Sequence, residues 1–327
     1  MTFAAISIIV PLYNKAVYVA STLNALSRQI SAIDEIIVVD DCSTDGSNVI
    51  AQRYASEHLR VLHREANAGP ATARNWGAEC ARGKFLLFFD ADDDPHPNLL
   101  AVLRRAISEF PTEAIFCFKI AYGAHGEQYQ SEADPVAAEC WRSPAILPID
   151  AFAHSALAGK PLCTASSTCV CRSVFIEAGG FLAGLRYCED PELWARLSSR
   201  YRIVKIPVVL ANYKDVPESL SQVQRIRIGA VEPYVETLRS LARSGPHVYG
   251  LLAFAMLKKN VVFARASGAT IGDIRRFIHR NRDGLDSGCV AILRVIGLMP
   301  VVLLRFLLHL RSWMLRRRAA RRATDAY

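Results

Sequence analysis

Hydrophobic and polar residues follow one another along the first 110 positions in blocks that predict strands and helices in alternation. Short runs of β-branched and aromatic residues have the length and composition of buried strands. Each is followed by a stretch with apolar residues at helical spacing. Strands are predicted at 6–10, 35–39, 60–63 and 85–89, and helices at 15–30, from about 48, at 71–81 and after Pro97 to about 110. This alternation favours an α/β fold with a doubly wound, largely parallel sheet.

The run Phe-Leu-Leu-Phe-Phe at 85–89 ends in four acids, Asp90, Asp92, Asp93 and Asp94. Ligands of open α/β sheets bind beyond the carboxyl ends of the strands, so Asp90 and Asp92 are expected at an active-site mouth. Carboxylates this close repel one another unless a cation lies between them, and Mg²⁺ or Mn²⁺ bound by such oxygens bridges to phosphate. A metal–diphosphate site is one interpretation, and a solvated turn after the strand is the other.

Two more strand ends carry candidate residues. The second strand ends in Asp40 and Asp41, and the first in Pro11-Leu12-Tyr13-Asn14. Neither GxGxxG nor GxxxxGK[ST] occurs, so no glycine-rich loop is present to hold a diphosphate. Asp41 can accept a hydrogen bond from a pyrimidine N3–H while Tyr13 stacks on the ring. Equally, Asp41 can form an Asx-turn and Tyr13 can pack within its own loop.

Four blocks of this sequence, in this order, resemble family 2 glycosyltransferases. They are Ser-Ile-Ile-Val-Pro-Leu-Tyr-Asn at 7–14, the acidic segment at 35–47, Asn-Ala-Gly at 67–69 with Ala-Arg-Asn at 73–75, and Asp-Ala-Asp-Asp at 90–93. Together they are far more specific than the DxD pattern alone. The resemblance implies a GT-A fold, a mixed nucleotide-sugar-binding sheet flanked by helices. It also implies a nucleoside-diphosphate sugar, most often a UDP-sugar, as the donor.

By position, the resemblance assigns residues of these blocks to the donor site. It places Pro11, Tyr13 and Asp41 at the nucleoside. It places Asp92, with Asp90, at the metal ion, Mn²⁺ or Mg²⁺, and at the diphosphate.

Two further charged residues, one within these blocks and one directly after the last, have less definite roles. Arg74 stands on the third predicted helix, where it can meet a phosphate, and a surface ion pair is the alternative. Asp94 lies outside the family's pattern, so we expect it to be solvated.

A carboxylate across from the diphosphate is needed to take the proton when a hydroxyl attacks an anomeric carbon. Asp190 is the candidate. The series Gly-Gly-Phe, Glu-Asp and Leu-Trp around it resembles the family segment in which this Asp is the base of an inverting displacement. Glu189 and Trp194 are then assigned to orientation and to acceptor packing. The alternative for Asp190 is a helix N-cap, because Pro191 follows at what would be the first helical position.

The remainder of the acceptor half gives weaker patterns, and most of residues 119–160 shows none. Strands are predicted near 114–120, at 163–170 and at 203–209, and a short helix at 172–178. Processive members of the family carry QxxRW, but Gln222 and Arg225 are followed by Ile226. Those members also thread their polymer through several membrane spans. Transfer of a single sugar is therefore favoured over polymer synthesis.

After about residue 226 the chain becomes helical and basic. Residues 288–310 are mostly apolar but include two Arg and one His, which fall on one narrow helical stripe. Charge near the centre of a bilayer is costly, so we expect an amphipathic helix, about 288–316, that lies in a membrane surface. Packing on the catalytic domain and spanning of the bilayer are the alternatives. Pro300 predicts a kink in each case.

The net charge of +8 is concentrated at the end of the chain. Residues 311–327 contain six Arg and one Asp, so the remainder is nearly neutral. The Arg cluster at 316–318 and 321–322 is expected to meet anionic lipid headgroups, and nothing else favours nucleic-acid binding. Nine cysteines without a CxxC pair indicate reduced thiols. The first five residues lack the basic region of a signal peptide, so we expect a cytoplasmic protein, peripheral on the inner face of the membrane.

These patterns predict both a domain organisation and an activity. The domains are a glycosyltransferase domain at 1–225, with a nucleotide-sugar half at 1–110 and an acceptor half at 111–225, and a helical region at 226–327. The activity is inverting, metal-dependent transfer of a single sugar to a hydroxyl of a glycan or lipid-linked acceptor, as in cell-surface polysaccharide synthesis. A sugar-phosphate nucleotidyltransferase is one rival, but it requires a glycine-rich basic loop after the first strand. A non-catalytic membrane-surface scaffold is the other, and it leaves the paired acids without a role.

Overall fold

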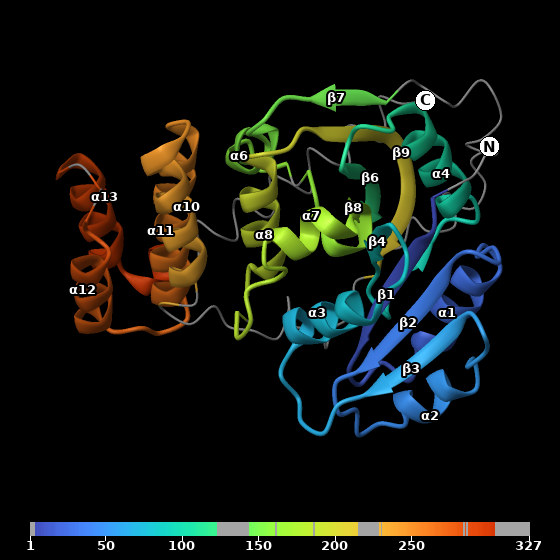
Figure 1. The fold of residues 1–327 in the computed structure, drawn as a ribbon. Coiled ribbons are helices and arrows are strands. Elements are labelled where there is room, and N and C mark those ends of the chain that lie inside the picture. Colours follow the sequence, from blue (N-terminus) through green and yellow to red (C-terminus); the bar gives the residue numbers. More distant parts are fainter. Residues whose placement is uncertain are drawn as a thin grey trace, which may run out of the picture.

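The computed structural model describes residues 4–122, 144–160, 162–185, 187–214, 231–283 and 287–304, together with residues 229 and 285. A nine-stranded mixed sheet runs through this part, in the order β3-β2-β1-β4-β8-β6-β9-β5, with β7 pairing to β9 (Figure 1). The strands are β1 Ile6–Leu12, β2 Glu35–Asp40, β3 Leu59–His63, β4 Phe85–Phe88, β5 Asp94–Pro95, β6 Ile115–Tyr122, β7 Ala145–Leu147, β8 Thr168–Cys171 and β9 Ile203–Tyr213. The mixed α/β sheet expected from the sequence is confirmed.

The first four strands in the order of the sheet, β3, β2, β1 and β4, are parallel to one another. Ile9 of β1 is paired with Ile37 of β2 on one side and with Phe88 of β4 on the other. The carboxyl ends of these strands therefore meet at one edge of the sheet. Beyond β4 the neighbouring strand β8 is antiparallel, which makes the sheet mixed.

Helices cover both faces of the sheet. Successive side chains of its buried strands point to opposite sides, and because both sets are apolar, each face has to be covered. Ile8 and Val10 belong to a core under α1, α2 and α4, whereas Ile9 belongs to a second core under α3, α6, α7 and α8. The helices are α1 Val19–Ser27, α2 Ser47–Gln52, α3 Pro70–Cys80, α4 Leu99–Glu109, α6 Ala151–Leu157, α7 Arg172–Glu177 and α8 Glu189–Ser198. The two cores make a three-layer arrangement with the sheet in the middle.

Helix α3 lies unusually close to the sheet at Gly77. A Cβ atom added there would be 2.4 Å from Cγ2 of Ile9 and 3.2 Å from Cγ2 of Val39. Only glycine fits without displacing one of these strands. This close packing fixes the position of α3, which carries Arg74 towards the carboxyl edge of the sheet.

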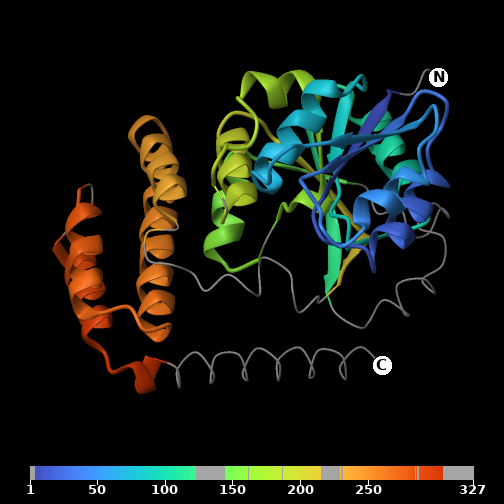
Figure 2. The ribbon, with the colours of Figure 1, turned by 90° about the horizontal axis from the view of Figure 1, so that it is seen from below.

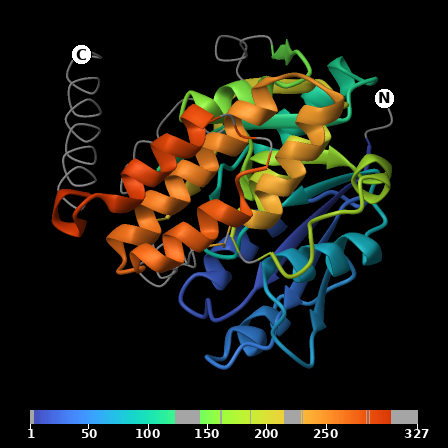
Figure 3. The same cartoon turned by 90° about the vertical axis from the view of Figure 1, so that its left-hand side faces the viewer.

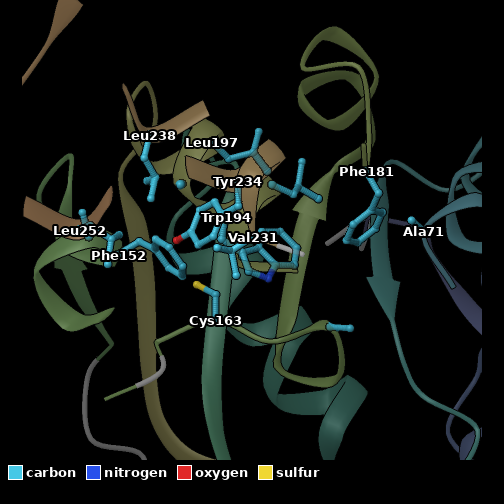
Figure 4. Packing of buried hydrophobic residues seen from close by; sticks show 14 of the residues in the cluster. Ala71, Phe152, Cys163, Phe181, Trp194, Leu197, Val231, Tyr234, Leu238 and Leu252 are labelled. Carbon is cyan, nitrogen blue, oxygen red and sulfur yellow. The ribbon is translucent and has the colours of Figure 1, made fainter. Parts of the chain in front are cut away.

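Four further helices follow the sheet, α10 Glu232–Ser244, α11 Val248–Ala266, α12 Ile271–Arg280 and α13 Ser287–Leu298. They lie side by side beyond α6 and α8 (Figures 1 to 3), with α12 and α13 outermost. Tyr234 and Leu238 of α10 and Leu252 of α11 share a core with Trp194 and Leu197 of α8 (Figure 4). The hydrophobic core is thus continuous from the sheet into the helical layer.

A buried carboxylate joins α8 to this helical layer. Glu192 of α8 is almost fully buried, and its Oε1 accepts a hydrogen bond of 2.8 Å from the hydroxyl of Thr237 on α10. Arg196, one turn further along α8, donates to both oxygens of the same carboxylate at 2.7 Å. Glu192 is therefore neutralised and hydrogen-bonded, as a buried charge requires.

The predicted strand at 163–170 is wrong in its first half. Residues Ala165–Ser167 form a 3₁₀ turn, η1, before β8 begins at Thr168. Thr164 and Ser167 exchange hydrogen bonds as a capping box, which stabilises the turn over an extended conformation. Sequence patterns also missed the short elements β5, β7 and α6. Residues 123–143, within the stretch without a pattern, lie outside the described residues.

The helical region bears out the predicted break at Pro300. Helix α13 ends at Leu298, and helical conformation resumes at 301–304. Among the helices of the described ranges, none combines the length and the apolar character that a membrane span requires. The continuation of the amphipathic helix to 316, the Arg cluster and the segment with Gln222, Arg225 and Ile226 lie outside the described residues.

Candidate active site

The carboxyl edge of β1, β2 and β4 brings together the predicted donor-site segments. Pro11 of β1 is paired with Val39 of β2, so the segments that follow these two strands are neighbours. Asn14 binds the loop after β2, because its Oδ1 accepts the Thr44 N–H at 2.8 Å. Tyr13 is 43% exposed, so a face of its ring is available to a ligand.

Asp41 has a different structural role from the turn considered as its alternative. Its carboxylate accepts the N–H groups of Gly69 at 2.7 Å and Ala68 at 3.1 Å, and it lies 2.9 Å from Nε of Arg64. The local turn is made by Asp40, whose Oδ1 accepts the Ser43 N–H at 3.2 Å. Asp41 therefore fixes the loop that leads into α3, and its contact with a nucleoside base stays a prediction.

Arg74 is the centre of the site. Its Nη2 lies 2.6 Å from Asp90 Oδ1, and its Nη1 lies 3.1 Å from Glu189 Oε1 and 3.4 Å from Asp190 Oδ1. The side chain is 4% exposed, so the alternative of a surface ion pair is wrong. Burial lowers the pKa of Arg74, but the three carboxylates outweigh this effect and hold it above its ordinary value. The guanidinium thus joins the acid after β4 to the acids of α8.

The residue after Arg74 ties the same helix to the acceptor half. Asn75 Nδ2 donates to the carbonyl of Phe181 at 2.8 Å, and its Oδ1 accepts the Phe181 N–H at 2.9 Å. The Phe181 ring in turn lies 5.3 Å from the guanidinium carbon of Arg74. The Ala-Arg-Asn block therefore positions the two halves of the site relative to each other.

Asp190 is not a helix N-cap. Helix α8 begins at Glu189, after Cys188 in a left-handed conformation with φ of 65°, so Asp190 is its second residue. The carboxylate turns away from its own helix and accepts the Ala165 N–H at 2.7 Å. Burial raises the pKa of Asp190 to about 7; Arg74 opposes this rise, and Glu189 and Asp90 add to it. A carboxyl group with this pKa is suited to accept a proton near neutral pH.

The 3₁₀ turn η1 contacts both acidic elements. Ala165 donates its N–H to Asp190, and the neighbouring Ser166 accepts the Asp90 N–H on its hydroxyl at 3.0 Å. The sequence pattern does not separate this turn from a strand, because small residues suit both. The spacing Thr164-x-x-Ser167, which is that of a capping box, was the sequence feature that could have predicted the turn.

Lys15 is a further residue of the site that the sequence patterns did not indicate. Its ammonium forms an ion pair with Asp92. The backbone beneath it is fixed, because the Lys15 N–H donates to Ser47 Oγ at 2.7 Å and the Ala16 N–H to Asp45 Oδ2 at 2.9 Å. A lysine thus neutralises the carboxylate to which the resemblance assigns the metal.

The last two acids of the run after β4 have other surroundings. Asp93 is buried, and burial raises its pKa well above the ordinary value, with Asp90 and Asp92 adding to the shift. Asp94 is in β5 and lies 2.5 Å from the ammonium of Lys214. The Asp94 side chain is 35% exposed, so it is solvated in part, as expected, and it also pairs with Lys214.

Asp90 and Asp92 fit a divalent cation in chemical type, since both are hard oxygen donors. No group of three or more His, Cys, Asp or Glu side chains within the described ranges is arranged to hold a metal ion. Two carboxylates supply only a minority of the oxygen ligands of such a cation, so a bound diphosphate and water would supply the others. Asp92 also forms an ion pair with Lys15. The residues therefore suit a cation that binds together with a diphosphate.

Trp194 does not lie at the surface. Its ring is 1% exposed and packs edge-to-face against Phe181 at a centroid distance of 6.2 Å (Figure 4). In this conformation it is a core residue with no face available to an acceptor. It supports α8 from beneath, on the helix that carries Asp190.

This fold has counterparts among solved structures. The structure of Staphylococcus aureus TarS residues 1–349 with UDP-GlcNAc matches with a TM-score of 0.65 at 19% identity over 90% of each chain. The mannosyltransferase PcManGT of Pyrobaculum calidifontis, solved with GDP-Man and Mn²⁺, matches with a TM-score of 0.55 at 18% identity over 91% of this chain and 86% of that one. The fold is thus the GT-A fold.

The sequence comparisons identify the family. The profile of glycosyl transferase family 2 matches residues 7–175. The chain belongs to glycosyl transferase family 2. The uncharacterised glycosyltransferase YibD of Escherichia coli is 38% identical over 133 residues, which are 38% of this chain and 37% of YibD. The chain therefore matches well under half the length of this relative.

Proposed function

We propose that the protein transfers a single sugar, with inversion, from a nucleoside-diphosphate sugar to a hydroxyl of a glycan or lipid-linked acceptor. The observation that carries this proposal is the position of Arg74. It joins Asp90, on the donor side, to Glu189 and Asp190, on the acceptor side. Donor diphosphate and acceptor base would thus be held at one place.

The donor is a UDP-sugar in this proposal. TarS was solved with UDP-GlcNAc, which supports UDP, whereas PcManGT was solved with GDP-Man. Pro11, Tyr13 and Asp41 would contact the nucleoside, with the exposed ring of Tyr13 stacking on the base. Asp90 and Asp92 would hold Mn²⁺ or Mg²⁺, which supplies positive charge to the departing diphosphate when it is bound.

Asp190 is the base in this proposal. The acceptor oxygen bonds to the anomeric carbon as the bond from that carbon to the diphosphate oxygen breaks, and the bonding pair leaves with the nucleoside diphosphate. The acceptor proton goes to Asp190 Oδ1, because its hydrogen bond from Arg74, at 3.4 Å, is longer than the 2.7 Å bond that Oδ2 accepts from the Ala165 N–H. Glu189 holds Arg74 in place from the other side. The pKa of about 7 matches this role.

The proposal extends to the acceptor and to the location of the protein. TarS is named a poly(ribitol-phosphate) β-N-acetylglucosaminyltransferase, which supports a cell-surface polymer as acceptor. Ile226 in place of a tryptophan favours transfer of one sugar at a time. We place the protein on the inner face of the cell membrane, held by its C-terminal helical region and the Arg-rich end of the chain.

Calorimetric titration with UDP, GDP and dTDP, each with and without Mn²⁺, tests the donor site. We expect metal-dependent binding of one nucleotide. Asp92→Ala should abolish it, whereas Asp94→Ala, which removes the same charge two residues away, should preserve it. No binding of any nucleotide would contradict the donor site.

Hydrolysis of the nucleotide sugar in the absence of acceptor tests the chemistry. Because water can replace the acceptor hydroxyl, turnover needs the base but not the unknown acceptor. Asp190→Asn should abolish this slow hydrolysis and leave nucleotide binding unchanged. Hydrolysis by Asp190→Asn at the wild-type rate would contradict Asp190 as the base.

A further inference from the structure

A groove of about 470 Å³ lies between α12 and α13, far along the chain from the candidate active site. It lies beside a tight crossing of the two helices, where a Cβ on Gly297 would be 2.5 Å from Cγ2 of Ile274. Apolar side chains and four basic ones line it: Ile271, Ile274, Ile278, Val290 and Leu298, and Arg275, His279, Arg282 and Arg294. Its volume is in the range of small-ligand sites.

Two of the four basic residues of the groove, Arg275 and Arg294, differ from nearby arginines in their partners. Arg276 pairs with Asp273 at 2.6 Å, and Arg280 lies 3.4 Å from Glu232. Arg275 and Arg294, by contrast, form no ion pair with any residue that the structure describes. Two guanidinium groups without a counterion at an apolar groove are complementary to a ligand with an anionic head and an apolar body.

The adjacent surface is apolar as well. Ile292, Val295 and Leu298 of α13 are about half exposed, and Val302, after the break at Pro300, is 80% exposed. Ile292, Val295 and Leu298 follow one another at three-residue spacing and so form an exposed strip along α13, the helix that walls the groove. A strip of this kind beside basic residues is typical of surfaces that lie on lipid bilayers.

We propose that the groove binds an anionic phospholipid of the membrane surface. Arg275 and Arg294 bind the phosphate, and the apolar wall of Ile274, Ile278 and Val290 takes the start of an acyl chain. Residues 305–327, with seven Arg and one Asp, lack the negative charge that the two guanidinium groups of the groove would bind. This site rests on the membrane-surface part of the proposed function and gives it a specific lipid contact.

Vesicle sedimentation with the full-length chain tests the contact. Vesicles of phosphatidylcholine with 30% phosphatidylglycerol would be compared with phosphatidylcholine alone, for wild type, the Arg275→Ser/Arg294→Ser variant and the Arg243→Ser/Arg276→Ser control. Arg243 and Arg276 are exposed and pair with Glu236 and Asp273. Their substitution removes the same amount of charge outside the groove. We expect the groove variant to weaken binding to anionic vesicles about thirtyfold and the control less than about threefold.

Soluble probes separate a lipid site from a general anion site. Dihexanoyl phosphatidylglycerol, below its critical micelle concentration, should bind wild type in calorimetry. Val290→Phe, which places a larger side chain in the groove, should weaken the binding of this lipid. Inorganic phosphate should bind at least tenfold more weakly. Equal binding of phosphate, or equal binding of the lipid by wild type and the groove variant, would overturn the proposal.

The outcomes also separate the groove from the wider proposal. If wild type binds anionic vesicles and the groove variant binds them equally well, the groove is wrong and the membrane-surface location stands. If wild type binds no anionic vesicles, both fall. Sugar-nucleotide hydrolysis is independent of either result, so a failed groove leaves the transfer activity separately testable.

Discussion

The ammonium of Lys15 and the carboxylate of Asp92 form an ion pair between the loop after β1 and the acidic turn after β4. Both side chains are mostly buried, so solvent screens the pair less than it screens surface pairs. The carboxylate predicted to bind a metal is thus already neutralised in the protein without ligand. A divalent cation that bound Asp92 would have to displace the lysine from it.

Lys15→Met should therefore raise the affinity for Mn²⁺ in the absence of nucleotide. We expect an increase of about fivefold, the equivalent of ~1 kcal/mol for the lost competitor. Electron paramagnetic resonance of free Mn²⁺ measures it directly. Lys84→Met, which removes the same charge at the opposite edge of the sheet, should leave the affinity unchanged. A decrease in the Lys15 variant would show that the lysine helps to hold the ion.

Arg74→Met should destabilise the fold and shift the pH dependence of hydrolysis. It leaves Asp90, Glu189 and Asp190 without their shared cation, and breaking a buried ion network costs about 3–5 kcal/mol. Because Arg74 opposes the rise in the pKa of Asp190, its loss should move the activity midpoint to higher pH. Denaturant unfolding and a pH–rate profile measure the two effects.

Two variants serve as references for that result. Arg74→Lys keeps the charge but cannot bridge three carboxylates, so its stability should fall between wild type and Arg74→Met. Arg105→Met on α4, which breaks a surface pair with Glu109, should change stability by less than about 0.5 kcal/mol. Equal stability of Arg74→Met and wild type would refute the role of Arg74 as the common counterion.

The pH dependence of activity should follow Asp190. With a pKa of about 7, the carboxyl is protonated below neutrality and cannot accept the acceptor proton. We expect kcat/KM to rise about tenfold per pH unit below pH 7 and to level off above it. A flat profile between pH 5 and pH 7 would contradict Asp190 as the base.

The same shift predicts how stability depends on pH. The folded-state pKa of Asp190, about 7, is above the ordinary value of 3.8, so between these pH values the folded state binds more protons than the unfolded state. The stabilising contribution of this group is present at low pH and is lost as the pH rises to about 7. Asp190→Asn cannot ionise, so its gain in melting temperature over wild type should be larger at pH 8 than at pH 5. Equal differences at both pH values would contradict the raised pKa.

Gly77→Ala should lower both stability and activity. The added methyl group would meet Ile9 at 2.4 Å, and such overpacking costs about 1–3 kcal/mol, offset by about 1 kcal/mol of helix propensity. Activity should fall because α3 carries Arg74. Gly272→Ala on α12 has its nearest neighbours at 3.6 Å, so it should be neutral or stabilising. Thermal unfolding of both variants provides the comparison.

The first half of the fold was predictable because each of its strands is a short apolar run followed by a helix. β1, β2, β3 and β4 lie where the pattern places them, and the resemblance of the blocks extended this to a family and a GT-A fold. The meeting of the segments that carry Tyr13, Asp41 and Asp90 also followed, because the parallel strands before them end at one edge.

The contacts across the site could not be read from the sequence. Lys15 and Asp92 are 77 residues apart, and Arg74 and Asp190 are 116 apart, so no local pattern connects them. Arg74 on an amphipathic helix has the same pattern whether it is exposed or buried. Trp194 was misplaced for a similar reason, since a core tryptophan and an acceptor-binding one are identical in sequence.

The hydrogen bond between Glu192 and Thr237 has a practical consequence for shortened versions of this protein. A version that stops after β9 would lose α10, uncover Trp194 and Leu197, and leave Glu192 with Arg196 as its remaining partner. Such a fragment would be expected to aggregate even though it contains every residue of the candidate active site. For the same reason, exchanging the helical layer with that of a relative would require α8 to be exchanged along with it.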